Sequence, residues 1–125
     1  MKLEEVLSGI STHRARLHKD NAWDDPHALS DIGNKLAVYN SYLADFIAPA
    51  HKQATDASHA VYLECLERGD SATKAEVMAR GESTAARAYY EKVKFVHSAT
   101  ASLVSFIQTK IRVAETQMKQ EGNLT

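Results

Sequence analysis

A cluster of cationic and aromatic side chains in the C-terminal half of the sequence could bind a polyanion. Four cations are spaced so that several can line one side of a helix: Arg80, Arg87, Lys92 and Lys94. Tyr89 and Tyr90 lie between them. Proteins hold single-stranded nucleic acid in this way, because cations bind phosphates and aromatic rings stack on bases. The alternative is that these charges form the solvated face of an ordinary helix.

The charges are unevenly distributed, although the formal net charge is only -1. Residues 1–73 hold 7 Lys/Arg and 11 Asp/Glu, whereas residues 74–125 hold 8 and 5. The other candidates for contact with phosphate lie outside the C-terminal cluster: Arg14, Arg16, Lys19 and Lys52. So few cations per subunit would bind weakly, and a cluster of identical subunits would multiply them.

Residues for catalysis or for metal binding do not cluster in the sequence. It contains no glycine-rich phosphate loop, no HExxH and no paired CxxC. The nearest metal half-sites are Asp56-x-x-His59 and Asp24-x-x-His27, whereas helical metal sites need several inward-facing carboxylates. Cys65 lies among apolar residues and is predicted to be a buried small hydrophobe. We therefore expect no enzyme activity, no cofactor and no metal.

The basic cluster begins a long helical run that is predicted over 72–120. Apolar or small residues recur three or four apart along it, as one face of a helix requires. A second row, which includes Phe95, Phe106 and Val113, makes the apolar surface wider than one partner helix needs. We therefore expect one partner helix from the same chain and another from a neighbouring copy. The predicted oligomer interface comprises Phe95, Leu103, Phe106, Ile107, Ile111 and Val113.

A short amphipathic helix is predicted over residues 2–19, and Asp20 and Asn21 are expected to end it. Trp23 follows in a predicted loop. Its ring is expected to hold this loop against the helices, and a platform for base stacking is the alternative.

The next helix is predicted over 26–68, after the start signal Asp25-Pro26. Apolar residues at heptad spacing, among them Tyr39, should pack on the C-terminal helix. Pro49 predicts a kink near Phe46.

Gly69 and Ser71 are suited to end one helix and to begin the next. The predicted fold is a single all-α domain over 1–125, in which a short N-terminal helix precedes two long antiparallel helices that form a helical hairpin and assemble as a homo-oligomer. The first ten residues do not resemble a signal peptide, and no apolar run could span a bilayer. We therefore expect a cytoplasmic location and no membrane.

Several short segments resemble, in order and nearly in spacing, the N-terminal part of the UvsY recombination mediators of T-even-type phages. These segments are Met1-Lys2-Leu3-Glu4-Glu5, Leu17-His18-Lys19-Asp20, Asp24-Asp25 and Leu36-Ala37-Val38-Tyr39-Asn40-Ser41-Tyr42-Leu43. The similarity continues more loosely through His51-Lys52, the glycine break Arg68-Gly69-Asp70 and the long C-terminal helix.

The resemblance implies a non-enzymatic protein that binds single-stranded DNA as a ring of about six or seven identical subunits. Such proteins help to load a RecA-type recombinase onto strands covered by single-stranded-DNA-binding protein, in recombination, replication and repair in the cytoplasm of the host cell. In that family the second helix is rich in lysine and arginine before the glycine break. Here residues 54–68 are mostly apolar and acidic, so the resemblance transfers a DNA contact only to Lys52 and, less directly, to Arg68.

Two other functions are compatible with the sequence. The acidic N-terminal half and the near-zero net charge also suit a small helical phage protein, such as an inhibitor or adaptor, that binds a protein partner and no nucleic acid. A helical-bundle enzyme or ligand carrier is the third hypothesis. A polar, carboxylate-lined cavity between the long helices would favour it.

Overall fold

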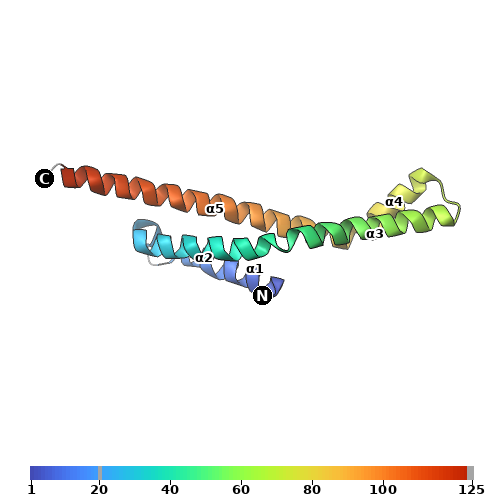
Figure 1. Ribbon diagram of the computed structural model, residues 1–125, viewed down its shortest axis with the longest axis horizontal. Coiled ribbons are helices and arrows are strands. Elements are labelled where there is room, and N and C mark those ends of the chain that lie inside the picture. Colours follow the sequence, from blue (N-terminus) through green and yellow to red (C-terminus); the bar gives the residue numbers. More distant parts are fainter. Residues whose placement is uncertain (20, 124–125) are drawn as a thin grey trace. The chain divides into compact units, whose positions relative to one another are not determined.

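The computed structural model describes residues 1–19 and 21–123 (Figure 1). This part of the chain is helical and contains no β-strand, which confirms the all-α class. Its elements are α1 (Leu3–Arg16), the 3-10 turn η1 (Ala22–Asp24), α2 (Pro26–Ala44), α3 (Ile47–Glu67), α4 (Ala72–Glu82) and α5 (Thr84–Asn123).

The chain divides into two compact units. Unit 1 combines Met1–Leu43 with the part of α5 from His97 onward, and unit 2 comprises Ala44–Val96. No helix in the part that the structure describes is long and apolar enough to cross a membrane.

The first helix is shorter than the predicted 2–19. It ends at Arg16, and the next three residues form a turn in which each amide bonds the carbonyl three positions back. Such tightening is common where a helix ends. Asn21 has a left-handed backbone with φ 55°, and Asp20, the other predicted end residue, lies outside the described residues.

Pro49 divides the predicted 26–68 helix into α2 and α3. Asp45 and Phe46 form a turn between them, as the predicted kink near Phe46 required. A proline has no amide hydrogen for the carbonyl four positions earlier, and it is tolerated in the first turn of a helix. Pro49 accordingly lies in the first turn of α3, which begins at Ile47.

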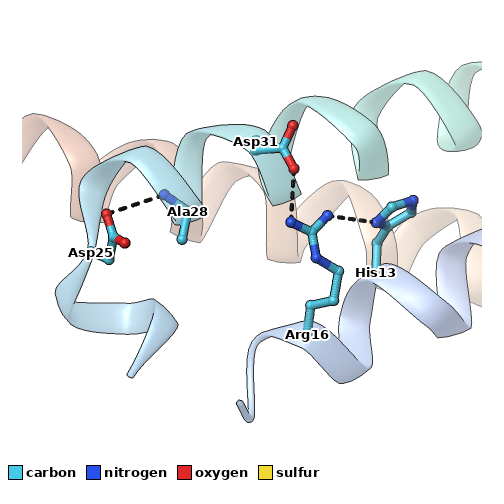
Figure 2. Close-up of polar contacts among 5 residues, drawn as sticks. All are labelled: His13, Arg16, Asp25, Ala28 and Asp31. Carbon is cyan, nitrogen blue, oxygen red and sulfur yellow. Dashed lines mark hydrogen bonds and ion pairs between the residues drawn. The ribbon is translucent and has the colours of Figure 1, made fainter. Parts of the chain in front are cut away.

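The start of α2 and the end of α3 follow the sequence signals. The Asp25 carboxylate accepts hydrogen bonds from the amides of His27 and Ala28, which caps α2, and Figure 2 shows the bond from Ala28. Gly69 has a left-handed backbone with φ 89°, and its amide bonds the Leu66 carbonyl at 3.0 Å. This geometry is a Schellman ending, which favours glycine because a left-handed backbone costs it little. Ser71 then caps α4 by accepting the Lys74 amide.

The prediction of one unbroken helix over 72–120 is wrong. Ser83 divides this run into α4 and α5 with φ -93° and ψ 5°, whereas helical residues have ψ near -42°. The buried Ser83 hydroxyl donates to the Ala79 carbonyl at 2.6 Å. A serine that bonds the carbonyl four positions back bends a helix, and sequence periodicity does not register it.

In unit 1, α5 lies antiparallel to α2. Gly33 meets Ile107, while Leu29, closer to the start of α2, shares a pocket with Ile111, further along α5. The buried apolar side chains of α1, α2 and α5 in this unit include Val6, Ile10, Leu29, Ile32, Leu36 and Ile107.

The heptad prediction needs one correction, because Tyr39 packs on α1 rather than on the C-terminal helix. Its ring lies over Gly9, and its centroid is 5.6 Å from that of His13. Gly33, on the same helix, meets Ile107 of α5. The apolar face of α2 therefore packs partly on α1 and partly on α5.

Two polar side chains interrupt the apolar packing of unit 1. Asn40 and Thr100 are buried, and within the described residues neither side-chain oxygen has a hydrogen-bond partner. Both lie two turns away from the contact between Gly33 and Ile107, so the antiparallel register places them at one level.

Unit 2 is built around small side chains. Helices α3 and α4 lie side by side, as Figure 1 shows, and the connection at Gly69 joins them. Their buried residues are Ala50, Ala54, Cys65, Ala75 and Ala79. Small residues let two helices approach closely, and the burial of Cys65 confirms its predicted structural role.

We expect Gly9→Ala to lower the free energy of unfolding by up to about 2 kcal/mol, because the overlap of the added Cβ with the Tyr39 ring costs about 1–3 kcal/mol and the higher helix propensity of alanine offsets about 1 kcal/mol of it. Chemical denaturation followed by circular dichroism measures this change. Gly81→Ala is the matched control. No atom of the described residues lies within 4 Å of a Cβ at Gly81 in α4, so this variant should be stabilised by about 0.5–1 kcal/mol. Equal effects of the two variants would contradict the packing of α1 against α2.

Candidate nucleic-acid interface

Unit 2 contains an open groove of about 500 Å³ that mixes charged and aromatic side chains. We call it the Tyr90 groove. Helix α3 lines it with His51, Ala54, Thr55, Ser58, His59 and Tyr62; α4 adds Glu76, Ala79 and Arg80; and α5 adds Arg87, Tyr90 and Glu91. Three of the residues that the sequence analysis grouped, Arg80, Arg87 and Tyr90, therefore line one surface.

The end of α4 positions the two arginines. One Arg87 guanidinium nitrogen, Nη2, donates to the Arg80 carbonyl at 2.7 Å. Thr84 Oγ donates to the same carbonyl at 3.0 Å and to that of Gly81 at 2.8 Å. Side chains thus bond the carbonyls of the last turn of α4. Arg87 is held by one nitrogen, and within the described residues its other N–H groups have no hydrogen-bond partner, so they can donate to an anion in the groove.

The aromatic part of the groove is centred on Tyr90, which is half-buried. The His51 ring meets it edge-on, with 4.9 Å between the ring centroids. Lys94 lies over the Tyr90 ring, with its amine 5.7 Å from the centroid. This distance is within the range of a cation–π contact. A cation and two rings are therefore gathered at one place.

The groove is not purely basic. Glu76 and Glu91 line it together with the two arginines. Among the described residues, neither carboxylate forms an ion pair or a hydrogen bond with a side chain of the groove. The groove therefore presents unpaired acceptors as well as cations.

Arg16, a predicted DNA contact, is engaged within unit 1 (Figure 2). Its guanidinium forms an ion pair with Asp31 at 2.8 Å and a hydrogen bond with His13 Nδ1 at 3.0 Å. The hydrogen bond from Arg16 lowers the pKa of Asp31. Burial, followed by the nearby charges of Arg16 and Lys35, lowers the pKa of His13. Arg16 therefore links α1 to α2.

The remaining predicted DNA contacts differ in whether a carboxylate engages the cation. Lys52 pairs with Asp56 at 2.7 Å, and this hydrogen bond raises the lysine pKa. Arg14, Lys19 and Lys92 are exposed. Arg14, Arg16 and Lys19 belong to unit 1, whereas the other five predicted DNA contacts belong to unit 2.

The predicted oligomer interface separates into two sets. Ile107 is fully buried beside Gly33, so it belongs to the core of its own chain, and its prediction as an interface residue needs correction. Leu103 and Ile111 are half-buried. The second apolar row is exposed, at 72% for Phe95, 59% for Phe106 and 50% for Val113.

Trp23 lies in η1 and packs edge-on against Phe106, with 5.5 Å between the ring centroids. The predicted role of holding the segment before α2 against the helices is therefore confirmed. The ring also lines a small pocket with residues of α2 and α5.

Sequence reasoning missed the contribution of α3 to the groove. His51, Thr55, Ser58 and Tyr62 follow one another at intervals of four, three and four, which places them on one face of a helix. This polar stripe was a usable signal. The two glutamates carried no comparable signal, because charged residues on a helix usually face solvent.

Comparison with protein-family models, with curated proteins and with solved structures found no match to this chain. Within the described residues, no group of three or more metal-ligating side chains is placed to hold an ion.

Proposed function

We propose that this protein is a recombination mediator, a non-enzymatic protein that binds single-stranded DNA and self-associates. The observation that carries the proposal is the Tyr90 groove, where Arg80 and Arg87 lie together with the half-buried rings of Tyr62 and Tyr90. Guanidinium groups suit phosphate oxygens, and rings accept unstacked bases of any sequence. A duplex hides its bases in the stack, so this groove favours single strands.

Self-association is part of the proposal because one groove holds few cations. Phe106 and Val113 lie seven residues apart on α5, and hence on one side of the helix, and both are more than a third exposed. A second copy that covered this row would bury apolar surface and bring another groove to the same strand. Linked sites bind a common strand far more tightly than isolated ones.

The remaining steps of the proposal rest on the resemblance to the UvsY mediators. An oligomer that holds a bent strand would weaken the grip of single-stranded-DNA-binding protein. It would then present free bases to a RecA-type recombinase in the cytoplasm of the host cell. Exposed helical surface is available for both protein partners.

The second candidate is a helical adaptor or inhibitor that binds only protein. Its support is that carboxylates offset several predicted DNA contacts. Asp31 pairs with Arg16, Asp56 pairs with Lys52, and two glutamates line the Tyr90 groove. A carboxylate-lined cavity would favour a ligand carrier, and these two glutamates line such a groove. Two arginines line the same groove, however, so it contains as many positive as negative side chains.

Removing the groove arginines should weaken binding of a fluorescent single strand by roughly tenfold at moderate salt. Fluorescence anisotropy of Arg80→Ala/Arg87→Ala against the parent protein measures this change. Affinity should fall log-linearly with salt, and the slope should drop by about 1.4 in the variant, or about 0.7 per lost phosphate contact. A duplex of the same length should bind more weakly than the single strand.

The matched control for this measurement is Arg112→Ala/Lys119→Ala, which removes two exposed cations of α5 in unit 1. It should retain most of the affinity. Equal losses in the two double variants would contradict binding at the groove, and no binding by the parent protein at low salt would favour the adaptor.

Phe106→Gln/Val113→Gln should reduce the mass in solution to that of a single chain while helix content is retained, because glutamine keeps the helix and removes the apolar row. Light scattering measures the mass, and circular dichroism measures the helix content. Val38→Gln/Tyr42→Gln is the control, since these residues form an exposed apolar pair on α2. Self-association through α5 would be contradicted by an unchanged mass in the first variant or by dissociation in the second.

A further inference from the structure

The two glutamates of the Tyr90 groove are unexpected in a site for a polyanion. Each carboxylate lies in the same groove as the guanidinium groups that would bind phosphate. A carboxylate and a phosphate are both negative, so they repel each other. Glu76 comes from α4 and Glu91 from α5, so they approach the groove from two elements. Within the described residues, neither carboxylate forms an ion pair with a side chain of the groove.

A carboxylate in such a site has a specific use, because it accepts hydrogen bonds and donates none. Among the atoms of a single strand, donors occur on the bases: cytosine, adenine and guanine carry amino groups. Thymine and uracil also carry a donor, the ring N3–H, but a carbonyl oxygen on each side of it repels a carboxylate, whereas cytosine presents a 4-amino group with two N–H bonds. Acidic side chains accordingly recognise the cytosine amino group in DNA complexes.

An aromatic ring, a carboxylate and a guanidinium of α5 all line the groove. Glu91 follows Tyr90 in α5, and Arg87 lies one turn earlier on the same helix. Consecutive residues of a helix point in different directions, so the shared lining of the groove is what gathers these groups. A base bound beside Tyr90 would have a carboxylate and a guanidinium within the same groove. The volume of about 500 Å³ lies within the range of natural small-ligand sites and is sufficient for a nucleotide.

We propose that the Tyr90 groove selects bases that carry an amino group, with Glu76 and Glu91 accepting from the base edge while Arg80 and Arg87 bind phosphate. This inference rests on the proposed binding of single-stranded DNA and adds a base preference to it. Single-strand binding by stacking alone tolerates any sequence, so the carboxylates are the source of the preference.

The test compares oligodeoxycytidine with oligodeoxyuridine of equal length. The two strands have the same backbone and ring size, and their bases differ at the 4-amino and 4-oxo positions. Anisotropy should show that the parent protein binds the cytidine strand about fivefold more tightly or better. Glu76→Gln/Glu91→Gln should bind both strands with similar affinity, because an amide both donates and accepts.

The control variant is Glu82→Gln/Glu115→Gln, which removes two exposed carboxylates outside the groove. It should strengthen binding of both strands equally and keep the ratio between them. If the parent protein binds both strands equally, the base preference is overturned and single-strand binding stands. If it binds neither strand, the proposed function itself fails. A preference that survives in Glu76→Gln/Glu91→Gln would also overturn the role of the carboxylates.

Discussion

The hydrogen bonds at the end of α4 are the constraint on which the candidate site depends. Ser83, Thr84 and Arg87 bond the carbonyls of the last turn with their side chains, and the chain bends at this point. The bend lies between α4 and α5, and both of these helices line the groove together with α3. Arg87 donates a hydrogen bond to the Arg80 carbonyl at the end of α4, and it is also a cation of the groove. The hydrogen bonds that end α4 therefore also position the Arg87 guanidinium.

Local signals in the sequence were sufficient for most of the helices. Asp25 and Ser71 cap the helices that follow them, Pro49 separates α2 from α3, and Gly69 ends α3 with a left-handed backbone. Each of these residues acts on backbone groups within a few positions, and such effects can be read along the chain. The Ser83 bend could not be read, because a serine within a helix is common and becomes a bend only when its hydroxyl turns back to the carbonyl.

Packing partners were harder to predict than buried faces. The heptad spacing of α2 correctly marked apolar positions for burial, but Tyr39 meets α1 while Gly33 meets α5. Periodicity identifies a face and contains no information about which helix covers it. The charges show the same limit. The Arg16–Asp31 ion pair joins two helices, so only the fold shows it, whereas Lys52 and Asp56 lie four residues apart on one helix and their pair can be read from the sequence.

Photo-cross-linking would test most directly whether the Tyr90 groove is where a single strand binds. A short strand that contains 5-iodocytosine, which keeps the 4-amino group, would be irradiated with the whole protein, and the attached peptides would be identified by mass spectrometry. We predict cross-links on the aromatic and histidine side chains of unit 2, at His51, Tyr62 or Tyr90. Cross-links confined to unit 1, at Trp23 or Tyr39, would contradict the account and would move the DNA contact away from the groove.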